Sequence, residues 1–289
     1  MLCLGIESTA HTFSAGIVDS QGEVLANEKN AVVTEEGGIK PGEAADSHIE
    51  NAVPVIERAL KKSEKKISEI DLISFAQGPG LGPCLRVGAT TARGLSLLHN
   101  KPLLGVNHCI AHIEIGRKKT GAKDPLVVYA SGANTQVIAY KGGKYRVFGE
   151  TLDTGIGNLL DTFGRELGLG FPAGPALDKM YFESRGELMD LPYSVKGMDL
   201  NFSGLLTAAK SKVGKAKKED LAYSLLHTAF AMLTEVSERA MVHAGKKELL
   251  LTGGVGASRA LQEMLREMCK GQGAKFHVTP RELSVDNGA

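Results

Sequence analysis

Residues 125–140 read Pro-Leu-Val-Val-Tyr-Ala-Ser-Gly-Ala-Asn-Thr-Gln-Val-Ile-Ala-Tyr, an apolar strand pattern, a polar turn and a second strand pattern. The start of the chain has the same order. Residues 2–7 predict a strand, residues 8–12 a turn rich in hydroxyl groups, and residues 13–18 a second strand. Each pattern then continues through a short turn into a third strand. The repeat, about half a chain apart, predicts an internal duplication.

This duplication predicts an α/β fold with two related domains, 1–122 and 123–289, each built from a meander followed by helices and further strands. The segment 118–124, Lys-Lys-Thr-Gly-Ala-Lys-Asp, is polar and is expected to link them. Two polar turns, one per domain, would then bracket a cleft. Backbone amides and hydroxyls at such turns are suited to bind phosphate.

The composition is that of an ordinary globular protein, with 289 residues, 43% apolar and 23% charged. The formal net charge is +1, so a nucleic-acid or membrane partner would have to meet a local patch. The most basic stretch, 210–218, favours a surface turn over an RNA contact. No segment reaches about 18 continuous apolar residues, and the start lacks the basic lead of a signal peptide. We therefore expect a cytoplasmic protein without a membrane partner.

Two histidines, His108 and His112, lie four residues apart in the segment Asn-His-Cys-Ile-Ala-His. Residues 102–106 predict a strand, and Asn107 is a good N-cap for a helix directly after it. Both imidazoles would project from one face of that helix, at the carboxyl end of the strand, where open α/β sheets bind ligands. The spacing permits one shared metal ion, although most histidine pairs at this spacing are only solvated helix faces.

A third ligand would strengthen the metal interpretation, and the best candidate is Asp286, which follows a predicted strand at 275–278. Two imidazoles and one carboxylate with open positions would suit iron(II) or zinc. A zinc metallopeptidase of the H-E-x-x-H type has its glutamate base directly after the first histidine, and here that position is Cys109. The pattern therefore excludes that class of enzyme.

A glycine-rich loop, Thr-Gly-Gly-Val-Gly-Ala-Ser at 252–258, joins a predicted buried strand to a helix. One such turn is weak evidence for a nucleotide site. Because this is the third loop of the kind in a duplicated fold, the evidence for a nucleotide site is considerably stronger. Residues 201–204, Asn-Phe-Ser-Gly, predict the cap of another helix.

A set of short segments, spread over essentially the whole chain, matches a known pattern. They are Gly5-Ile-Glu-Ser-Thr9, Gly78-Pro-Gly-Leu81, Leu85-Arg-Val-Gly88, His108-Cys-Ile-Ala-His112, Ser131-Gly-Ala-Asn-Thr-Gln136, Asn201-Phe-Ser-Gly204, Gly253-Gly-Val255 and Asp286-Asn-Gly288. In this order they resemble the universal tRNA threonylcarbamoyladenosine transferase family, called TsaD in bacteria and the catalytic subunit of KEOPS in archaea and eukaryotes. The residues within these motifs are closer to those of the archaeal and eukaryotic branch.

The resemblance implies a duplicated actin/Hsp70/sugar-kinase (ASKHA) fold. It also implies transfer of threonylcarbamoyl from threonylcarbamoyl-AMP to N6 of the adenosine beside the anticodon of tRNA. His108, His112 and Asp286 are then the ligands of one divalent metal ion, iron or zinc. The implied positions for threonylcarbamoyl-AMP or another adenine nucleotide, with magnesium if ATP binds, are Ser131, Gly132, Asn134, Thr135, Asp161, Gly174, Asp178, Gly254 and Ser258.

The partners that the resemblance implies are tRNA, an atypical kinase and a small dimerising subunit. The predicted helices 43–66 and 85–99 are our candidates for a docking surface. The chain stops three residues after Asp286, whereas the family usually continues through another helix on the first domain, and some archaeal relatives are fused there to the kinase. We therefore expect that helix to be missing. Three residues depart from the family pattern, namely Ala133, Ala173 and Ser258.

A small-metabolite kinase of the same fold is the alternative, because phosphate loops alone do not separate the two activities. Such a kinase needs a carboxylate base beside the γ-phosphate and has no use for two histidines and an aspartate. A non-catalytic paralogue would be expected to lose one of these three residues, and all are present. No nucleophilic serine or cysteine constellation is apparent. We therefore expect the RNA amine to attack the activated carbonyl directly.

Overall fold

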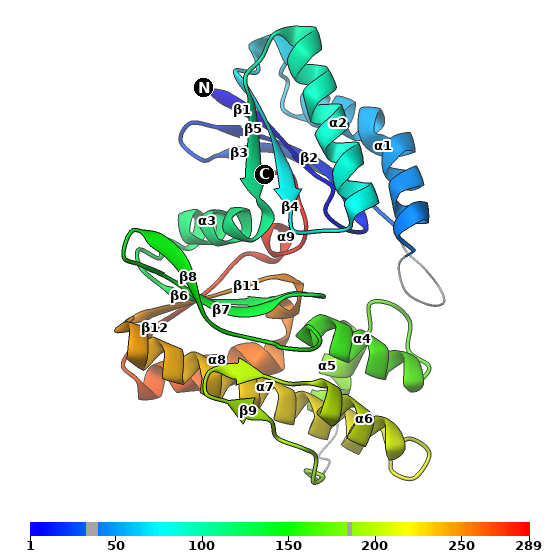
Figure 1. Ribbon diagram of the computed structural model, residues 1–289, viewed down its shortest axis with the longest axis vertical. Helices are drawn as coiled ribbons and strands as arrows, with labels where there is room; N and C mark the ends of the chain where they lie inside the picture. Colours follow the sequence, from blue (N-terminus) through cyan, green and yellow to red (C-terminus); the bar gives the residue numbers. More distant parts are fainter. Residues whose placement is uncertain (33–39, 184–186) are drawn as a thin grey trace. The chain divides into compact units, whose positions relative to one another are not determined.

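The computed structural model describes residues 1–32, 40–183 and 187–289 (Figure 1). Within these residues the chain divides into two compact units. The first consists of Met1–Ile115 and Val285–Ala289, and the second of Gly116–Ser284. The last five residues therefore belong with the N-terminal part of the chain, although the whole second unit separates them in the sequence.

The first unit contains a five-stranded sheet in the order β3-β2-β1-β4-β5. Its strands are β1 Leu2–Glu7, β2 Thr12–Asp19, β3 Val24–Ala31, β4 Leu72–Gly78 and β5 Leu103–Asn107. The first three form an antiparallel meander, and β4 and β5 run parallel to β1. The helices are α1 Pro41–Lys62, the short turn η1 Ile67–Glu69, α2 Gly82–His99 and α3 His108–Thr120, whose last turns lie in the second unit.

The second unit contains a sheet in the order β12-β11-β6-β7-β8 and a two-stranded hairpin. The strands are β6 Leu126–Ala130, β7 Thr135–Lys141, β8 Lys144–Glu150, β9 Val195–Lys196, β10 Asp199–Leu200, β11 Glu248–Thr252 and β12 Lys275–Val278. The helices are α4 Ile156–Glu166, α5 Gly174–Glu183, α6 Ser203–Ser211, α7 Lys218–Ala244, η2 Gly254–Ala257, α8 Arg259–Gly271 and α9 Arg281–Ser284.

The two large sheets have the same topology. In each, the first strand lies at the centre, an antiparallel meander extends to one side, and two later parallel strands extend to the other. This equivalence confirms the predicted duplication and the α/β class. It also places the turn after β6 and the loop after β11 at neighbouring carboxyl ends of parallel strands, where such sheets bind ligands.

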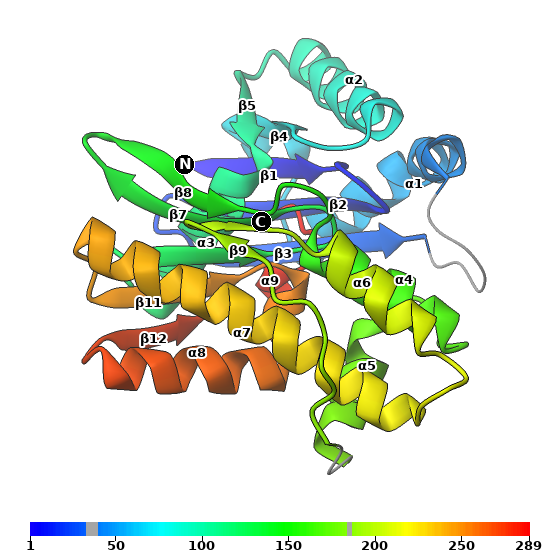
Figure 2. The same cartoon turned by 60° about the horizontal axis from the view of Figure 1, so that its bottom comes forward.

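The core of the second unit is built around α7, which packs beside α8 (Figure 2). Its buried residues recur along the helix, including Leu225, Met232 and Val236. These side chains form the apolar face of α7, which packs into the core. Among the helices in the described ranges, none has the length and apolar character that crossing a membrane requires.

Candidate functional site

The start of α3 fixes the two histidines. Asn107 is the last residue of β5, and its Oδ1 accepts a hydrogen bond from the backbone N of Ile110 at 3.2 Å, which confirms the predicted cap. His108 and His112 therefore lie one turn apart, with ring centroids 4.7 Å apart. They are only 7% and 5% exposed, which excludes a solvated helix face.

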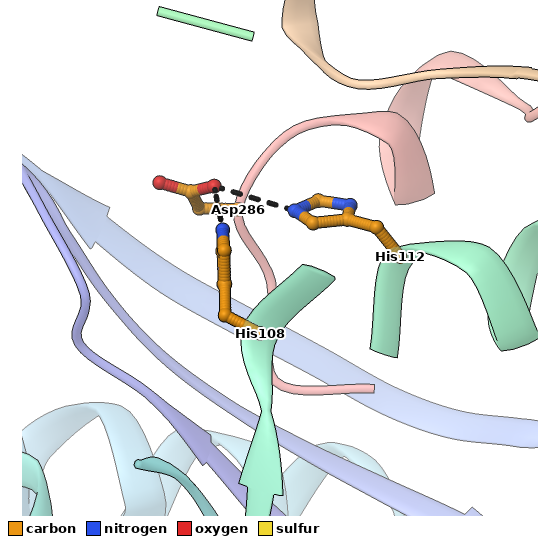
Figure 3. A group of neighbouring side chains, drawn as sticks. All are labelled: His108, His112 and Asp286. Atoms are coloured by element: carbon orange, nitrogen blue, oxygen red, sulfur yellow. Dashed lines mark ion pairs between the residues drawn. The ribbon is translucent and has the colours of Figure 1, made fainter. Parts of the chain in front are cut away.

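The C-terminal segment brings Asp286 to this pair (Figure 3). Its Oδ1 lies 3.6 Å from Nε2 of His108 and 3.6 Å from Nε2 of His112. One potential ligand atom from each side chain lies within 4.8 Å of the others. The three side chains belong to the same unit, so the cluster is complete within it.

The tail that carries Asp286 lies directly on the sheet. The backbone N of Gly288 donates to Oγ of Ser14 at 2.9 Å. A Cβ atom on Gly5 would lie 2.1 Å from the carbonyl oxygen of Gly288, and one on Gly16 would lie 2.5 Å from its carbonyl carbon. Both positions require glycine, because a side chain there would push the tail, and Asp286 with it, off β1 and β2.

Sequence reasoning missed Glu7, the last residue of β1, which is 5% exposed. Its Oε2 lies 2.9 Å from Nδ1 of His108, and its Oε1 accepts a hydrogen bond from the backbone N of Thr9 at 2.5 Å. When Nδ1 of His108 carries the proton and donates to Glu7, Nε2 is left as a lone-pair donor facing Asp286. The available signal was a carboxylate in an otherwise apolar strand that ends at a polar turn.

Charge and burial oppose each other in this cluster. Burial by itself would lower the pKa of His108, but the hydrogen bond and charge of Glu7, together with the charge of Asp286, raise it. Burial would likewise raise the pKa of Asp286, but the hydrogen bond from His112 and the neighbouring His108 and His11 hold it below its usual value. The Asp286 carboxylate is therefore ionised at neutral pH, the form that a metal ion binds.

In the second unit, the turn after β6 is closed by its own polar groups. The backbone N of Ser131 donates to the carbonyl of Asn134 at 2.9 Å, and the backbone N of Asn134 donates to Oγ of Ser131 at 3.3 Å. The carbonyl of Gly132 accepts from the backbone of α4 at 2.9 Å. Thr135 is buried, and its Oγ1 accepts from the first residue of α4 at 2.8 Å. The Thr135 hydroxyl therefore supports the turn from inside.

The glycine-rich loop after β11 lies against this turn, because β6 and β11 are neighbouring parallel strands. Gly253 has a φ of +92°, and a Cβ atom there would lie 2.3 Å from the carbonyl oxygen of Ala130. Gly254 follows with open space beside its Cα. The Ser131 turn and the Gly254 loop thus form one ligand-type edge of the sheet.

Asp178 of α5 reaches the start of α8. Its Oδ1 accepts from Oγ of Ser258 at 2.5 Å, and its Oδ2 accepts from the first backbone N of α8 at 3.1 Å. Asp161 of α4 accepts from the backbone N of Ala173 at 2.8 Å and so holds the residue before Gly174, where α5 begins. The structure brings Asp178 and Ser258 into contact, and Asp161 supports the loop next to Gly174.

The duplicated sheets and their loops define an α/β protein of the actin/Hsp70/sugar-kinase (ASKHA) class. Solved structures agree with this fold. HypF from Thermococcus kodakarensis matches with a TM-score of 0.67 and 16% identity, over 99% of this chain and 46% of that one. A ROK family glucokinase from Streptomyces griseus matches with a TM-score of 0.54 and 10% identity, over 98% and 96%. At such identities the likeness shows the fold alone.

Sequence comparison is more specific. A family model described as TsaD, tRNA N6-adenosine threonylcarbamoyltransferase, matches residues 23–289. A protein of that description from Thermococcus sibiricus is 56% identical over 100% of this chain and 89% of its own length. A probable bifunctional tRNA threonylcarbamoyladenosine biosynthesis protein from Methanothermobacter thermautotrophicus is 53% identical over 100% of this chain and 54% of its own length. The chain belongs to the tRNA N6-adenosine threonylcarbamoyltransferase family.

This membership confirms the resemblance in the sequence and makes the protein a transferase. It also decides against the small-metabolite kinase, since the likeness to glucokinase is confined to the fold.

Proposed function

We propose that the protein transfers a threonylcarbamoyl group from threonylcarbamoyl-AMP to N6 of the adenosine next to the anticodon in tRNA. Family membership supports the reaction. The observation that carries the site is the convergence of two Nε2 atoms and one carboxylate oxygen, from His108, His112 and Asp286.

These three donors fit one divalent metal ion, iron or zinc. Bonds of about 2.0–2.2 Å place the ligand atoms of one ion roughly 3–3.5 Å apart, close to the 3.6 Å between each Nε2 and Oδ1 of Asp286. Two imidazoles and one carboxylate leave positions open for a substrate. An ion bound there would act as a Lewis acid on the carbonyl that is attacked. Glu7 orients His108 toward that position.

The loops of the second unit suit the nucleotide. Backbone amides in the Ser131 turn, with Gly132 and Asn134, and in the Gly254 loop are suited to phosphate, as glycine-rich turns at strand ends are in general. We assign Asp178 to a ribose hydroxyl, and Ser258, with the loop at Asp161 and Gly174, to the nucleoside. Thr135 acts by holding the turn. If ATP binds instead, magnesium would accompany its phosphates.

Direct attack by the RNA amine needs no enzyme nucleophile. A carbamoyl-phosphate mixed anhydride is already activated, so the protein chiefly orients it and stabilises the charge that develops on the carbonyl. Burial raises the pKa of Cys3, Cys84 and Cys269, which keeps these thiols in the protonated, weakly nucleophilic form. These three thiols are therefore poor candidates for an enzyme nucleophile.

The partners that we propose are an atypical kinase and a small dimerising subunit, acting with tRNA in the cytoplasm. The helices α1 and α2 pack together and support a docking surface, because both expose apolar side chains. On α1 these are Ile49 and Val53, 63% and 62% exposed, and on α2 they are Leu97 and Leu98, each 77% exposed.

The experiment that tests this function supplies the purified protein with the partner subunits, tRNA and threonylcarbamoyl-AMP. Nucleosides are then released by digestion and weighed by mass spectrometry. We expect N6-threonylcarbamoyladenosine with the native chain and none above background with the His108→Ala/His112→Ala variant. A native enzyme that leaves the adenosine unmodified would contradict the proposal.

A further inference from the structure

Cations are concentrated in one part of the second unit. Between residues 117 and 147 the only acidic side chain is that of Asp124, in a chain whose net charge is +1. The basic residues of this segment are Arg117, Lys118, Lys119, Lys123, Lys141, Lys144 and Arg146. Because the net charge of the chain is close to zero, a nucleic-acid partner would have to meet a local basic patch, and this segment is one.

Two hydrogen bonds of Arg117 bring the two basic segments, 117–123 and 141–146, together. The Arg117 guanidinium donates through Nη1 to the hydroxyl of Tyr145 at 3.1 Å and through Nη2 to the carbonyl of Lys123 at 2.7 Å. These bonds tie the end of α3 to the β7–β8 hairpin and to the turn before β6. Figures 1 and 2 show the hairpin beside the end of α3. Lys141 and Lys144 lie opposite each other at the hairpin tip.

The neighbouring acidic groups are already engaged. Asp124 forms an ion pair with the buried Lys246, whose ammonium also donates to the carbonyl of Tyr140 at 2.8 Å. Glu248 accepts hydrogen bonds from the backbone N atoms of Lys123 and Asp124 at 2.9 and 3.0 Å. Lys118, Lys123, Lys141, Lys144 and Arg146 are all exposed. These five side chains therefore present positive charge to the solvent.

An exposed aromatic side chain lies within this patch. The Tyr140 ring is 48% exposed and meets the Tyr145 ring edge to face, with centroids 5.2 Å apart. Exposed aromatic faces beside lysine and arginine are typical of surfaces that hold single-stranded or looped RNA. The combination of this ring with several cations therefore favours RNA as the partner.

The stretch 210–218, the most basic in the sequence, is a weaker candidate. Lys210 is paired with Glu166, and Lys218 donates to the carbonyl of Leu167 at 3.0 Å. Two acidic residues, Glu219 and Asp220, follow this stretch directly and offset part of its positive charge. Its remaining exposed lysines make it a suitable control.

We propose that the basic surface formed by residues 117–123 and 141–146 binds the phosphate backbone of the tRNA substrate. The proposal rests on the proposed function for the identity of the RNA. Phosphate contacts by lysine and arginine add affinity that falls with salt and carry no sequence preference, so this surface would position the tRNA and leave selection of the adenosine to the active site.

The test compares two matched variants in the enzyme assembled with its partners. Lys141→Gln/Lys144→Gln removes two exposed lysines from the surface, and Lys215→Gln/Lys217→Gln removes two from the control stretch. The tRNA dissociation constant is measured over a salt series. Each lost phosphate contact should reduce the slope of log K against log salt by about 0.7–0.9, and two should weaken binding about tenfold or more near 0.1 M salt. The KM for tRNA should rise at unchanged kcat, with metal content and nucleotide binding as in the native enzyme.

Equal tRNA affinity and equal salt slope for the two variants would overturn the proposal that the basic surface binds tRNA. Loss of a protein subunit from the assembly, seen by gel filtration, with unchanged tRNA affinity would overturn it as well and assign the surface to that subunit. These binding measurements do not depend on turnover. A native assembly that binds tRNA but leaves it unmodified would instead contradict the proposed function.

Discussion

His108 and His112 are buried, and this determines how their substitution acts. The His108→Ala/His112→Ala variant should lose its metal. It should also leave the buried Glu7 carboxylate without its imidazole partner, at a cost of about 1–3 kcal/mol in the free energy of unfolding. Metal analysis of anaerobically purified protein, with urea unfolding of both proteins, checks both effects. Stoichiometric metal in the double variant would exclude this site.

Glu7 provides a finer test of the same centre. Its two oxygens each accept one hydrogen bond, from His108 and from the backbone of Thr9, and glutamine would turn one of these acceptors into a donor. Glu7→Gln should therefore weaken metal affinity by about 10–100-fold, the usual effect of losing a group that orients a ligand. Chelator competition measures this change. Glu57→Gln, an exposed carboxylate on α1, should bind metal as the native protein does.

At the scale of elements, α6 begins on a cap that lies far away in the sequence. Asp153 accepts hydrogen bonds from the backbone N of Phe202 and from the backbone N and Oγ of Ser203, at 2.9, 2.9 and 2.6 Å. Residues 201–204 therefore contain the start of α6, as expected, but the capping carboxylate comes from Asp153 and not from this segment. The residue at the N-cap position is Phe202, which has no side-chain group to donate or accept.

This cap predicts a pH-dependent stability difference. Burial would raise the pKa of Asp153, but the hydrogen bonds from Ser203 and from the backbone N atoms of Phe202 and Thr154 outweigh it and lower the pKa. The stabilisation that the ionised Asp153 gives the folded protein is therefore complete above the unfolded pKa, about 3.9. It is lost as pH falls through the lower folded pKa. Asp153→Ala should cost about 1 kcal/mol at pH 7 and less at pH 3. Urea unfolding of both proteins at both pH values checks it, and a constant difference would contradict it.

The link between α5 and α8 allows a test of the nucleotide site. Asp178→Asn keeps the shape of the side chain but removes the charge that we assign to a ribose hydroxyl. Because Asp178 also bonds the start of α8, the Tm without ligand should fall somewhat. The rise in Tm that an adenine nucleotide produces, measured from each protein's own baseline, should be smaller in the variant. Equal rises in Tm for the two proteins would show that Asp178 does not bind the nucleotide.

At the scale of the whole molecule, the net charge of +1 limits what the chain does alone. One basic surface supplies few phosphate contacts, and such contacts by themselves give weak, salt-sensitive binding. The isolated protein should bind metal and nucleotide but modify tRNA poorly, and the partners should raise tRNA affinity with a steep salt dependence. Filter binding across a salt series, with and without partners, measures this. Tight binding by the isolated chain would contradict it.

The sequence by itself determined what depends on neighbours along the chain. Strand alternation and polar turns predicted both meanders, and the Asn107 cap predicted the start of α3 with both histidines on one face. These features depend on backbone geometry and on contacts within a few residues, so local patterns are enough to predict them. The ordered motifs, with the family comparison, settled the class of enzyme.

Only the tertiary structure decided which distant residues meet. It returned Val285–Ala289 to the first unit, because Gly5 and Gly16 leave room for Gly288 against the sheet. It paired Glu7 with His108, placed Asp153 at α6, and gathered two basic segments around Arg117. Each of these contacts depends on how strands and helices pack, and packing joins residues whose separation along the chain leaves no periodic signal.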